Sequence, residues 1–229
     1  ELAMQQHPAS TSDIRLHSYW RSSAAYRVRI ALGLLELDYA QTTWKMIDAE
    51  HKSEAYQALA SFGLVPMLEI DGLKLQQSMA IIEYLQERHA DRPVLLPAQP
   101  ALRAKARALA QLIACEVHPL NNLRTLDQLR SRFGADDAQV REWYQHWCHE
   151  GLGAVEAVLA EDAAQTFALG AQPGLVECFL IPQIYNARRF GVDMQRYPRL
   201  HGIDAACAAL PAFAQAQPEN QPDAVAAAH

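Results

Sequence analysis

The feature of this 229-residue sequence that most constrains its fold is a change of pattern at a proline-rich stretch. Residues 92–100 (RPVLLPAQP) hold three prolines in nine positions, which is typical of a linker. Short strands and helices alternate before this stretch, whereas the pattern after it is only helical. We therefore expect an α/β domain over residues 13–95, an all-α domain over residues 100–215, and tails at residues 1–12 and 216–229.

The first predicted domain has the element order βαβ(α)ββα. Residues 14–17 alternate as a strand, and a helix should begin near Ser22, with apolar residues at i, i+3, i+4 and i+7 from Val28. A second strand is expected over residues 39–46 and a short helix over residues 51–60. The pair Asp71-Gly72 between alternating apolar residues predicts a hairpin, and a further helix should span residues 78–89.

The second predicted domain consists of helices alone. The periodicity predicts them from residue 101 onward and over residues 137–160, 175–190 and 203–210.

Composition argues against two classes of partner. The net charge is −6 and basic residues do not cluster beyond Arg188-Arg189, so we expect no nucleic acid ligand. No apolar run reaches the length of a membrane span and the start lacks a signal-peptide pattern, so we expect no membrane partner and a cytoplasmic protein. The cysteines form no CxxC pair, which favours reduced thiols over a disulfide framework.

The start of the first helix is a candidate anion site. Ser22 and Ser23 lie where the first unpaired N–H groups of the helix should point to solvent, and Arg21 precedes them. From the residues alone, an ordinary serine N-cap is the favoured explanation of this position.

Five segments in order and spacing carry a resemblance to a known family: RSSAAYRVRIAL, LVPMLEIDG, QQSMAIIEYL, EVHPLNNLR and IPQIYNARRFGVDM. They resemble the zeta-class glutathione transferases, which include maleylacetoacetate and maleylpyruvate isomerases. The resemblance covers residues 13–223. It implies a thioredoxin-like N-terminal domain, a helical C-terminal domain, glutathione as cofactor and a homodimer.

The resemblance gives the helix start a specific role. It implies that Ser22, with Ser23 beside it, stabilises the thiolate of glutathione, and that Arg21 stabilises the carboxylate or enolate of the substrate. A thiol pKa lowered by ~2 units needs about 2.7 kcal/mol. The family pattern continues Ser-Ser-Cys-Ser, whereas this chain has Ala24-Ala25. A mechanism that needs a protein thiol there is excluded, and we expect weaker or narrower activity.

Two more segments are implied to hold glutathione. The Val65-Pro66 bond would be trans from general frequencies, but the resemblance implies cis, with the backbone of Val65 paired to the cysteinyl part. Gln77 and Ser78 are implied to hold the γ-glutamyl carboxylate at a helix start. The alternatives are a structural proline at a strand start and simple helix capping.

Substrate recognition is implied for a third group of residues. Arg124 and Arg189 match positions that the maleyl isomerases use for carboxylates, and guanidinium groups suit such ligands. His118 and Asn122 lie four residues apart on one predicted helical face and would line the same small pocket for an anionic substrate. Surface ion pairs for the arginines and a packed histidine at a proline kink remain alternatives. The sequence indicates no metal site.

The favoured interpretation is therefore a glutathione-dependent cis–trans isomerase of a maleyl keto-acid, acting by thiolate addition, rotation and elimination. A general glutathione transferase for other electrophiles and a non-catalytic glutathione-fold binding protein are the alternatives. The family begins its core helix with Ser/Thr-x-x-Asp, whereas this chain has Gly174 at the cap. We expect Gly174→Thr to raise the melting temperature.

Overall fold

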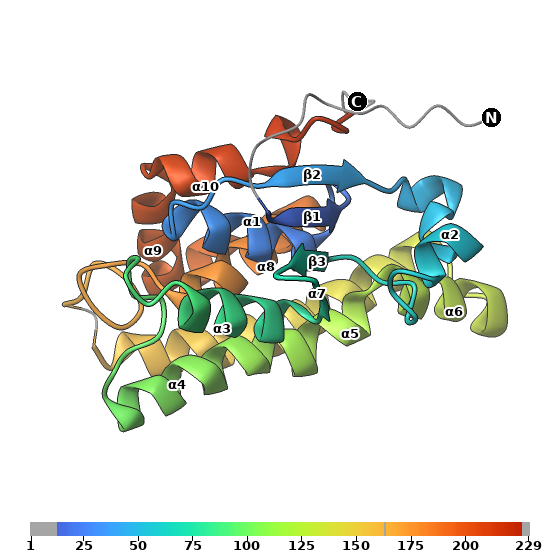
Figure 1. Cartoon of the computed structure of the whole chain (residues 1–229). Helices are drawn as coiled ribbons and strands as arrows, with labels where there is room; N and C mark the ends of the chain where they lie inside the picture. The colour runs from blue at the N-terminus through green and yellow to red at the C-terminus, as the bar shows by residue number, and fades with distance from the viewer. Residues whose placement is uncertain (1–12, 163, 226–229) are drawn as a thin grey trace. The chain divides into compact units, whose positions relative to one another are not determined.

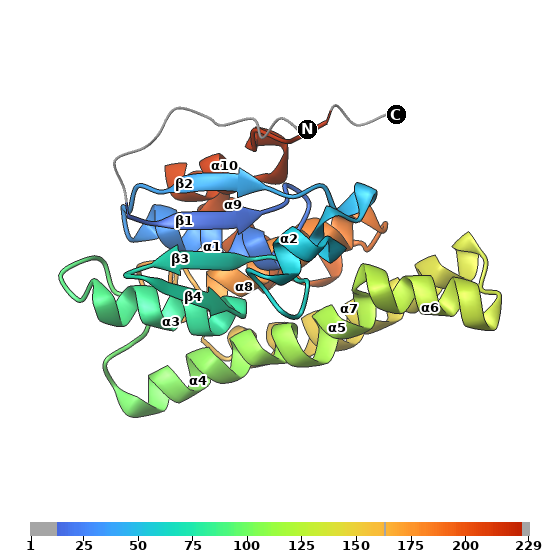
Figure 2. The same cartoon turned by 45° about the vertical axis from the view of Figure 1, so that its right-hand side comes forward.

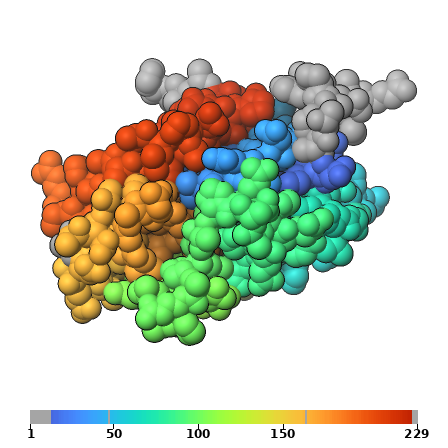
Figure 3. Space-filling model, turned by 60° about the vertical axis from the view of Figure 1, so that its left-hand side comes forward, coloured from blue at the N-terminus to red at the C-terminus, as the bar shows by residue number. Residues whose placement is uncertain are grey.

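The computed structural model describes residues 13–162 and 164–225, apart from the side chain of Ile47. The predicted tail at residues 1–12 lies outside the described residues. The chain divides into two compact units: Glu1–Pro93 together with Gln215–His229, and Val94–Ala214. The second unit takes the colours from green to red-orange in Figures 1 and 3.

The first unit is built on a four-stranded mixed sheet of order β2-β1-β3-β4. β1 pairs in parallel with β2 and antiparallel with β3, and β3 pairs antiparallel with β4. Figure 2 shows α1 behind this sheet. The bounds are β1 (Arg15–Ser18), α1 (Ser23–Leu34), β2 (Ala40–Thr43), η1 (Met46–Asp48), η2 (Glu50–Lys52), α2 (Glu54–Gln57), β3 (Met67–Ile70), β4 (Leu73–Gln76) and α3 (Ser78–Arg88).

Local sequence explains the sharpest turn in this unit. Asp71 and Gly72 have φ angles of 52° and 75°, so both adopt the left-handed conformation that a two-residue hairpin requires. The predicted hairpin is confirmed. The region of residues 51–60 is less regular than predicted, because Ser53 caps at the N–H of Tyr56 and starts a helix of one turn.

The second unit contains helices and no named strand among its described residues. The bounds are α4 (Pro100–Gln111), the π-helix η3 (Leu112–Val117), α5 (His118–Asn121), α6 (Leu123–Phe133), α7 (Asp137–Ala160), α8 (Leu175–Arg189), η4 (Met194–Arg196) and α9 (Pro198–Ala208). Asp136 and Gln139 cap α7 reciprocally. The predicted fold class, an α/β part followed by an all-α part, is confirmed.

The end of the chain differs from the predicted tail at residues 216–229. α10 (Pro211–Ala216) is followed by η5 (Pro218–Asn220), and Pro218 and Gln221 are buried. The reason is that groups of this segment bond to residues near the start of the first unit, to which the segment itself belongs; for example, the N–H of Trp20 donates to Asp223 at 3.0 Å. Polar composition alone gave no sign of these bonds. Residues 226–229 lie outside the described residues.

Candidate functional site

The N-terminus of α1 begins as the sequence indicates. Ser22 is the N-cap, with φ −67° and ψ 114°, and its Oγ accepts a hydrogen bond from the N–H of Ala25 at 3.1 Å. The first turn contains no acidic residue, so nothing in it competes with a bound anion for the positive end of the helix dipole. A serine hydroxyl has two acceptor lone pairs and one donor. Capping therefore leaves the hydroxyl proton of Ser22 available to an anion.

Arg21 lies in the turn just before this helix. Its guanidinium stacks on the ring of Trp20, with 4.3 Å between the guanidinium carbon and the ring centroid. The turn is closed by the N–H of Ser22, which donates to the carbonyl of Tyr19 at 3.0 Å. Ser23 is buried as the first residue of the helix.

The Val65-Pro66 peptide bond is cis, as the resemblance implies. Val65 is 7% exposed and packs in a cluster with Tyr56 and Met67. The hydroxyl of Tyr56 donates to the carbonyl of Leu64 at 2.7 Å and so fixes the backbone immediately before Val65.

The start of α3 has an unusual backbone. Gln77 has φ 71°, a region that residues other than glycine rarely adopt, and its side chain does not cap the helix. Ser78 is buried, and its Oγ accepts from Nη1 of Arg27 at 3.1 Å. Arg27 is itself buried in α1, so one guanidinium joins the two helices. Sequence reasoning missed Arg27, because a buried arginine inside a helix has no local signature.

A buried histidine links three elements of the same unit. His17 in β1 accepts from Nε1–H of Trp44 at its Nδ1, over 2.9 Å, and its Nε2 lies 2.6 Å from a carboxylate oxygen of Glu69. Because an indole nitrogen only donates, Nδ1 must be unprotonated and Nε2 carries the proton. Burial lowers the pKa of His17, while the carboxylate of Glu69 opposes this shift. The ring is therefore held neutral.

In the second unit, His118 and Asn122 lie together but not on one continuous helix. α5 ends at Asn121, and Asn122 is extended, with φ −70° and ψ 148°, because it caps α6 through the N–H of Arg124 at 3.2 Å. The prediction of a shared helical face was wrong in this detail. The two side chains still meet, with 3.3 Å between Nδ2 of Asn122 and Nε2 of His118.

Arg124 and Arg189 are both exposed. Nη1 of Arg189 lies 3.4 Å from Oδ1 of Asn186, and neither arginine forms an ion pair with any residue that the structure describes. In contrast, the neighbouring Arg188 pairs with Asp204 at 2.6 Å. The alternative of an ordinary surface ion pair therefore does not explain Arg124 or Arg189.

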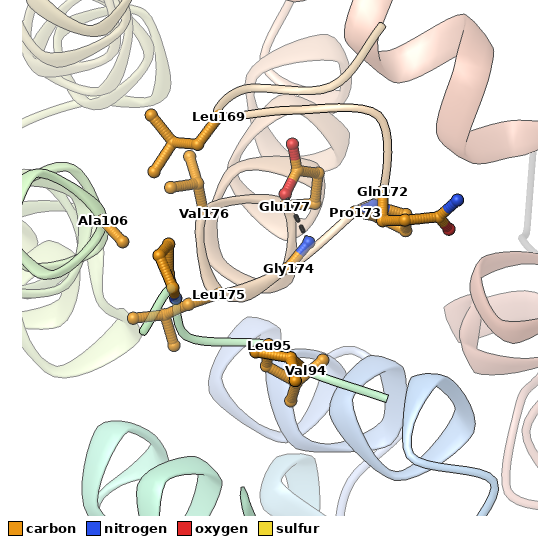
Figure 4. A pocket seen from close by; sticks show the side chains of 11 residues that line it. Val94, Leu95, Ala106, Leu169, Gln172, Pro173, Gly174, Leu175, Val176 and Glu177 are labelled. Carbon is orange, nitrogen blue, oxygen red and sulfur yellow. Dashed lines mark hydrogen bonds between the residues drawn. The ribbon is translucent and has the colours of Figure 1, made fainter. Parts of the chain in front are cut away.

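A small pocket of the second unit lies around the start of α8 (Figure 4) and holds none of the predicted site residues. The carboxylate of Glu177 is buried there and accepts from the N–H groups of Gly174 at 2.8 Å and Ala168 at 2.6 Å. A Cβ atom on Gly174 would lie 2.5 Å from the carbonyl oxygen of Leu95. The prediction that Gly174→Thr stabilises the chain is wrong, because that backbone oxygen occupies the space.

Over residues 13–162 and 164–225, no group of three or more His, Cys, Asp or Glu side chains is arranged to hold a metal ion. Within the same part of the chain, none of the helices combines the length and apolar character needed to span a bilayer.

Comparison with known proteins identifies relatives along nearly the whole chain. The family described as "Glutathione S-transferase, N-terminal domain" matches residues 12–87. Maleylacetoacetate isomerase of Pseudomonas aeruginosa is 46% identical over 93% of this chain and 100% of its own length. Maleylpyruvate isomerase of a Ralstonia species is 42% identical over 92% of this chain and 99% of its own length.

Solved structures agree with this match. The holo structure of a maleylpyruvate isomerase, described as a bacterial zeta-class glutathione S-transferase, has a TM-score of 0.90 at 42% identity, covering 92% of this chain and all of that one. Maleylacetoacetate isomerase of Anaeromyxobacter dehalogenans, with glutathione bound in its active site, has a TM-score of 0.83 at 43% identity. The match covers 93% of this chain and 98% of that chain. The chain belongs to the zeta class of glutathione transferases, the family of the maleylacetoacetate and maleylpyruvate isomerases.

Proposed function

We propose that this protein is a glutathione-dependent cis–trans isomerase of a maleyl keto-acid, such as maleylacetoacetate or maleylpyruvate. The observation that carries the proposal is the pair of helix N-termini of α1 and α3 in the first unit. The 46% identity to a maleylacetoacetate isomerase supports it. α1 and α3 both begin at a serine and have no acidic residue in the first turn. Arg27 links them through its bond to Ser78.

The residues present fit glutathione. At α1, the Ser22 hydroxyl keeps a donor for the sulfur, and the helix dipole favours the thiolate over the thiol. At α3, Ser78 likewise keeps its proton as a donor for a carboxylate, and the buried charge of Arg27 lies 3.1 Å from its oxygen. The side chain of Gln77, which α3 does not use as a cap, is available to the same carboxylate. Val65 would offer its backbone groups to the cysteinyl part, with Pro66 setting their direction.

The chemistry that glutathione supplies when bound is reversible addition of its thiolate to the cis double bond, so that the bond can rotate and elimination gives the trans isomer. Ser22, supported by Ser23 and the first N–H groups of α1, would hold the sulfur charge at one place. Arg21 would stabilise negative charge that develops on the substrate. The absence of a thiol at Ala24 leaves this stabilisation to hydroxyl and backbone groups.

Recognition of the keto-acid is assigned to residues of the second unit. Arg124 and Arg189 are exposed guanidinium groups without a carboxylate partner among the described residues, which suits a dicarboxylate-like substrate. His118 and Asn122 form a hydrogen-bonded pair beside the start of α6 and would orient the keto group. We also propose a cytoplasmic homodimer; all four cysteines are unpaired, as in reducing compartments.

The test is an assay of maleylpyruvate and maleylacetone with and without glutathione, in which the change from the maleyl to the fumaryl isomer is followed by ultraviolet absorbance. We expect isomerisation only when protein and glutathione are both present. Turnover of halogenated acids or aryl halides with no isomerisation above the uncatalysed rate would instead support a general transferase and would refute the proposal.

A further inference from the structure

The backbone of Trp20 is held from two sides by groups distant in the sequence. Its N–H donates to Oδ2 of Asp223 at 3.0 Å, and its carbonyl accepts from Nη2 of Arg29 at 3.1 Å. Trp20 occupies the turn that ends at Ser22, and its ring carries the guanidinium of Arg21. Both backbone polar groups of Trp20 are thus fixed by residues outside the turn.

Arg29 joins three segments of the first unit. Its side chain is 1% exposed and reaches from α1 to Trp20, to Oγ of Ser18 at 3.2 Å and to the carbonyl of Ala216 at 3.0 Å. A buried guanidinium is costly unless its donors are satisfied, so moving any of these acceptors would carry a large penalty. The C-terminal end of α10 is therefore tied to the turn before α1.

The segment that carries Asp223 is ordered by its own contacts. The side-chain amide of Gln221 donates to the carbonyls of Gln215 at 2.9 Å and Gln217 at 2.8 Å, and Gln221 is buried. This closes a turn over residues 215–221 and presents Asp223 just beyond it. Figure 1 shows this part in dark red near the C-terminus.

The carboxylate of Asp223 is suited to a fixed bond. Burial raises the pKa of Asp223, and the N–H of Trp20 and the charge of Arg29 oppose the rise. A hydrogen bond from a backbone N–H to a carboxylate in such surroundings contributes more than one between neutral groups. Losing it would leave the N–H of a buried residue without its acceptor.

We propose that Asp223 and Arg29 are positioning residues, which hold the turn of residues 19–22 so that the Ser22 hydroxyl and the start of α1 keep the orientation that stabilises a thiolate. This inference rests on the proposed function for its consequence, although not for the contacts. It assigns the C-terminal segment a role in the reaction without contact with the reacting atoms.

The first test measures amide hydrogen exchange over residues 19–25 in the ligand-free chain. We expect Asp223→Ala to accelerate exchange there by about 10- to 100-fold, the factor for a lost charged hydrogen bond. Asp223→Asn retains an acceptor oxygen but not the charge, so it should accelerate exchange by only about fivefold. A chain that ends at Gln221 is a second variant, because it removes the carboxylate and keeps the Gln221 turn.

Glu156→Ala is the matched control. Glu156 accepts from the backbone N–H groups of Arg199 at 3.0 Å and Leu200 at 2.9 Å in the second unit, so the substitution removes the same kind of bond elsewhere. We expect it to leave exchange over residues 19–25 unchanged. General destabilisation would accelerate exchange in both variants alike.

The second test titrates the thiol of bound glutathione by the ultraviolet absorbance of its thiolate. We expect Asp223→Ala to raise this pKa by about 1 unit, a tenfold loss of thiolate at a pH below it, and Asp223→Asn to restore it. The proposal is overturned if the folded Asp223→Ala protein or the folded chain that ends at Gln221 keeps wild-type exchange over residues 19–25, or if the thiol pKa does not move in Asp223→Ala. A protein that lacks isomerase activity would refute the proposed function alone, because the exchange measurement needs neither glutathione nor substrate.

Discussion

The cap of α8 offers the sharpest test of how packing overrides local preference. Gly174 has φ −150° and ψ −147°, a combination outside the β region that non-glycine residues favour, so its backbone suits glycine and its surroundings add a second constraint. The next N–H, of Leu175, donates to the carbonyl of Leu95 at 2.9 Å. A Cβ atom on Gly174 would lie 2.5 Å from that same oxygen, well inside the 3.0 Å that real Cβ contacts respect.

The magnitude follows from three contributions. Overpacking against a backbone atom costs about 1–3 kcal/mol, and displacing the Leu95 carbonyl weakens a hydrogen bond that contributes about 1 kcal/mol. The lower entropy of the unfolded alanine chain offsets about 0.4–1 kcal/mol. We expect Gly174→Ala to lower the free energy of unfolding by about 2 kcal/mol, and the melting temperature by about 4–8 °C for a chain of this size.

Differential scanning calorimetry and urea unfolding would measure this effect. Gly202→Ala is the matched control, because Gly202 lies in α9 with nothing within 4 Å of its added Cβ. That substitution should stabilise the chain by about 0.5–1 kcal/mol, as expected for an exposed helical glycine. A melting temperature for Gly174→Ala equal to or above the wild type would refute the steric argument.

Two further predictions concern charge. Arg189→Ala should raise KM for the anionic substrate by about 10-fold and leave the affinity for glutathione unchanged. Arg188→Ala, which breaks the pair with Asp204, should change neither quantity. Equal effects of the two substitutions in steady-state kinetics would contradict a substrate-binding role for Arg189. For His17, the lowered pKa means that the unfolded chain binds the proton first, so this group should reduce the free energy of unfolding as pH falls below 6.5. NMR titration should show a His17 pKa below 6.5. This pKa should rise in Trp44→Phe, which removes the donor to Nδ1. No rise would contradict the inferred tautomer, in which Nε2 carries the proton and donates to Glu69.

Local signals in the sequence were sufficient for most elements of the fold. The Asp71-Gly72 turn and the Ser22 cap are each set by residues adjacent in the chain, and α7 spans Asp137–Ala160, as its periodicity predicts. Interactions between residues close in the sequence determine such features, so the local sequence is sufficient to predict them. The site residues in α1, at Val65 and at Ser78 came from the resemblance, not from periodicity.

The features that sequence reasoning missed depend on contacts between distant residues. The bond from Asp223 to Trp20 spans 203 positions, and that from Arg29 to Ala216 spans 187. From the sequence, Gly174 is a weaker cap than the family's Ser or Thr. The reason for the glycine is the carbonyl of Leu95, which fills the space beside it and is too distant in the sequence for a local pattern to reveal. The break at Asn122 was missed for a related reason: a continuous apolar pattern does not show where a cap interrupts a helix.

The central claim is that Ser22 stabilises the thiolate that drives isomerisation. Its most direct test compares wild type and Ser22→Ala in glutathione-dependent isomerisation of maleylpyruvate, with saturating glutathione and with the melting temperature recorded. Loss of the cap alone should cost about 1 kcal/mol of stability. We predict that Ser22→Ala lowers kcat by at least about 100-fold, because the thiolate loses one hydrogen-bond donor. Wild-type kcat in a folded Ser22→Ala protein would contradict the account.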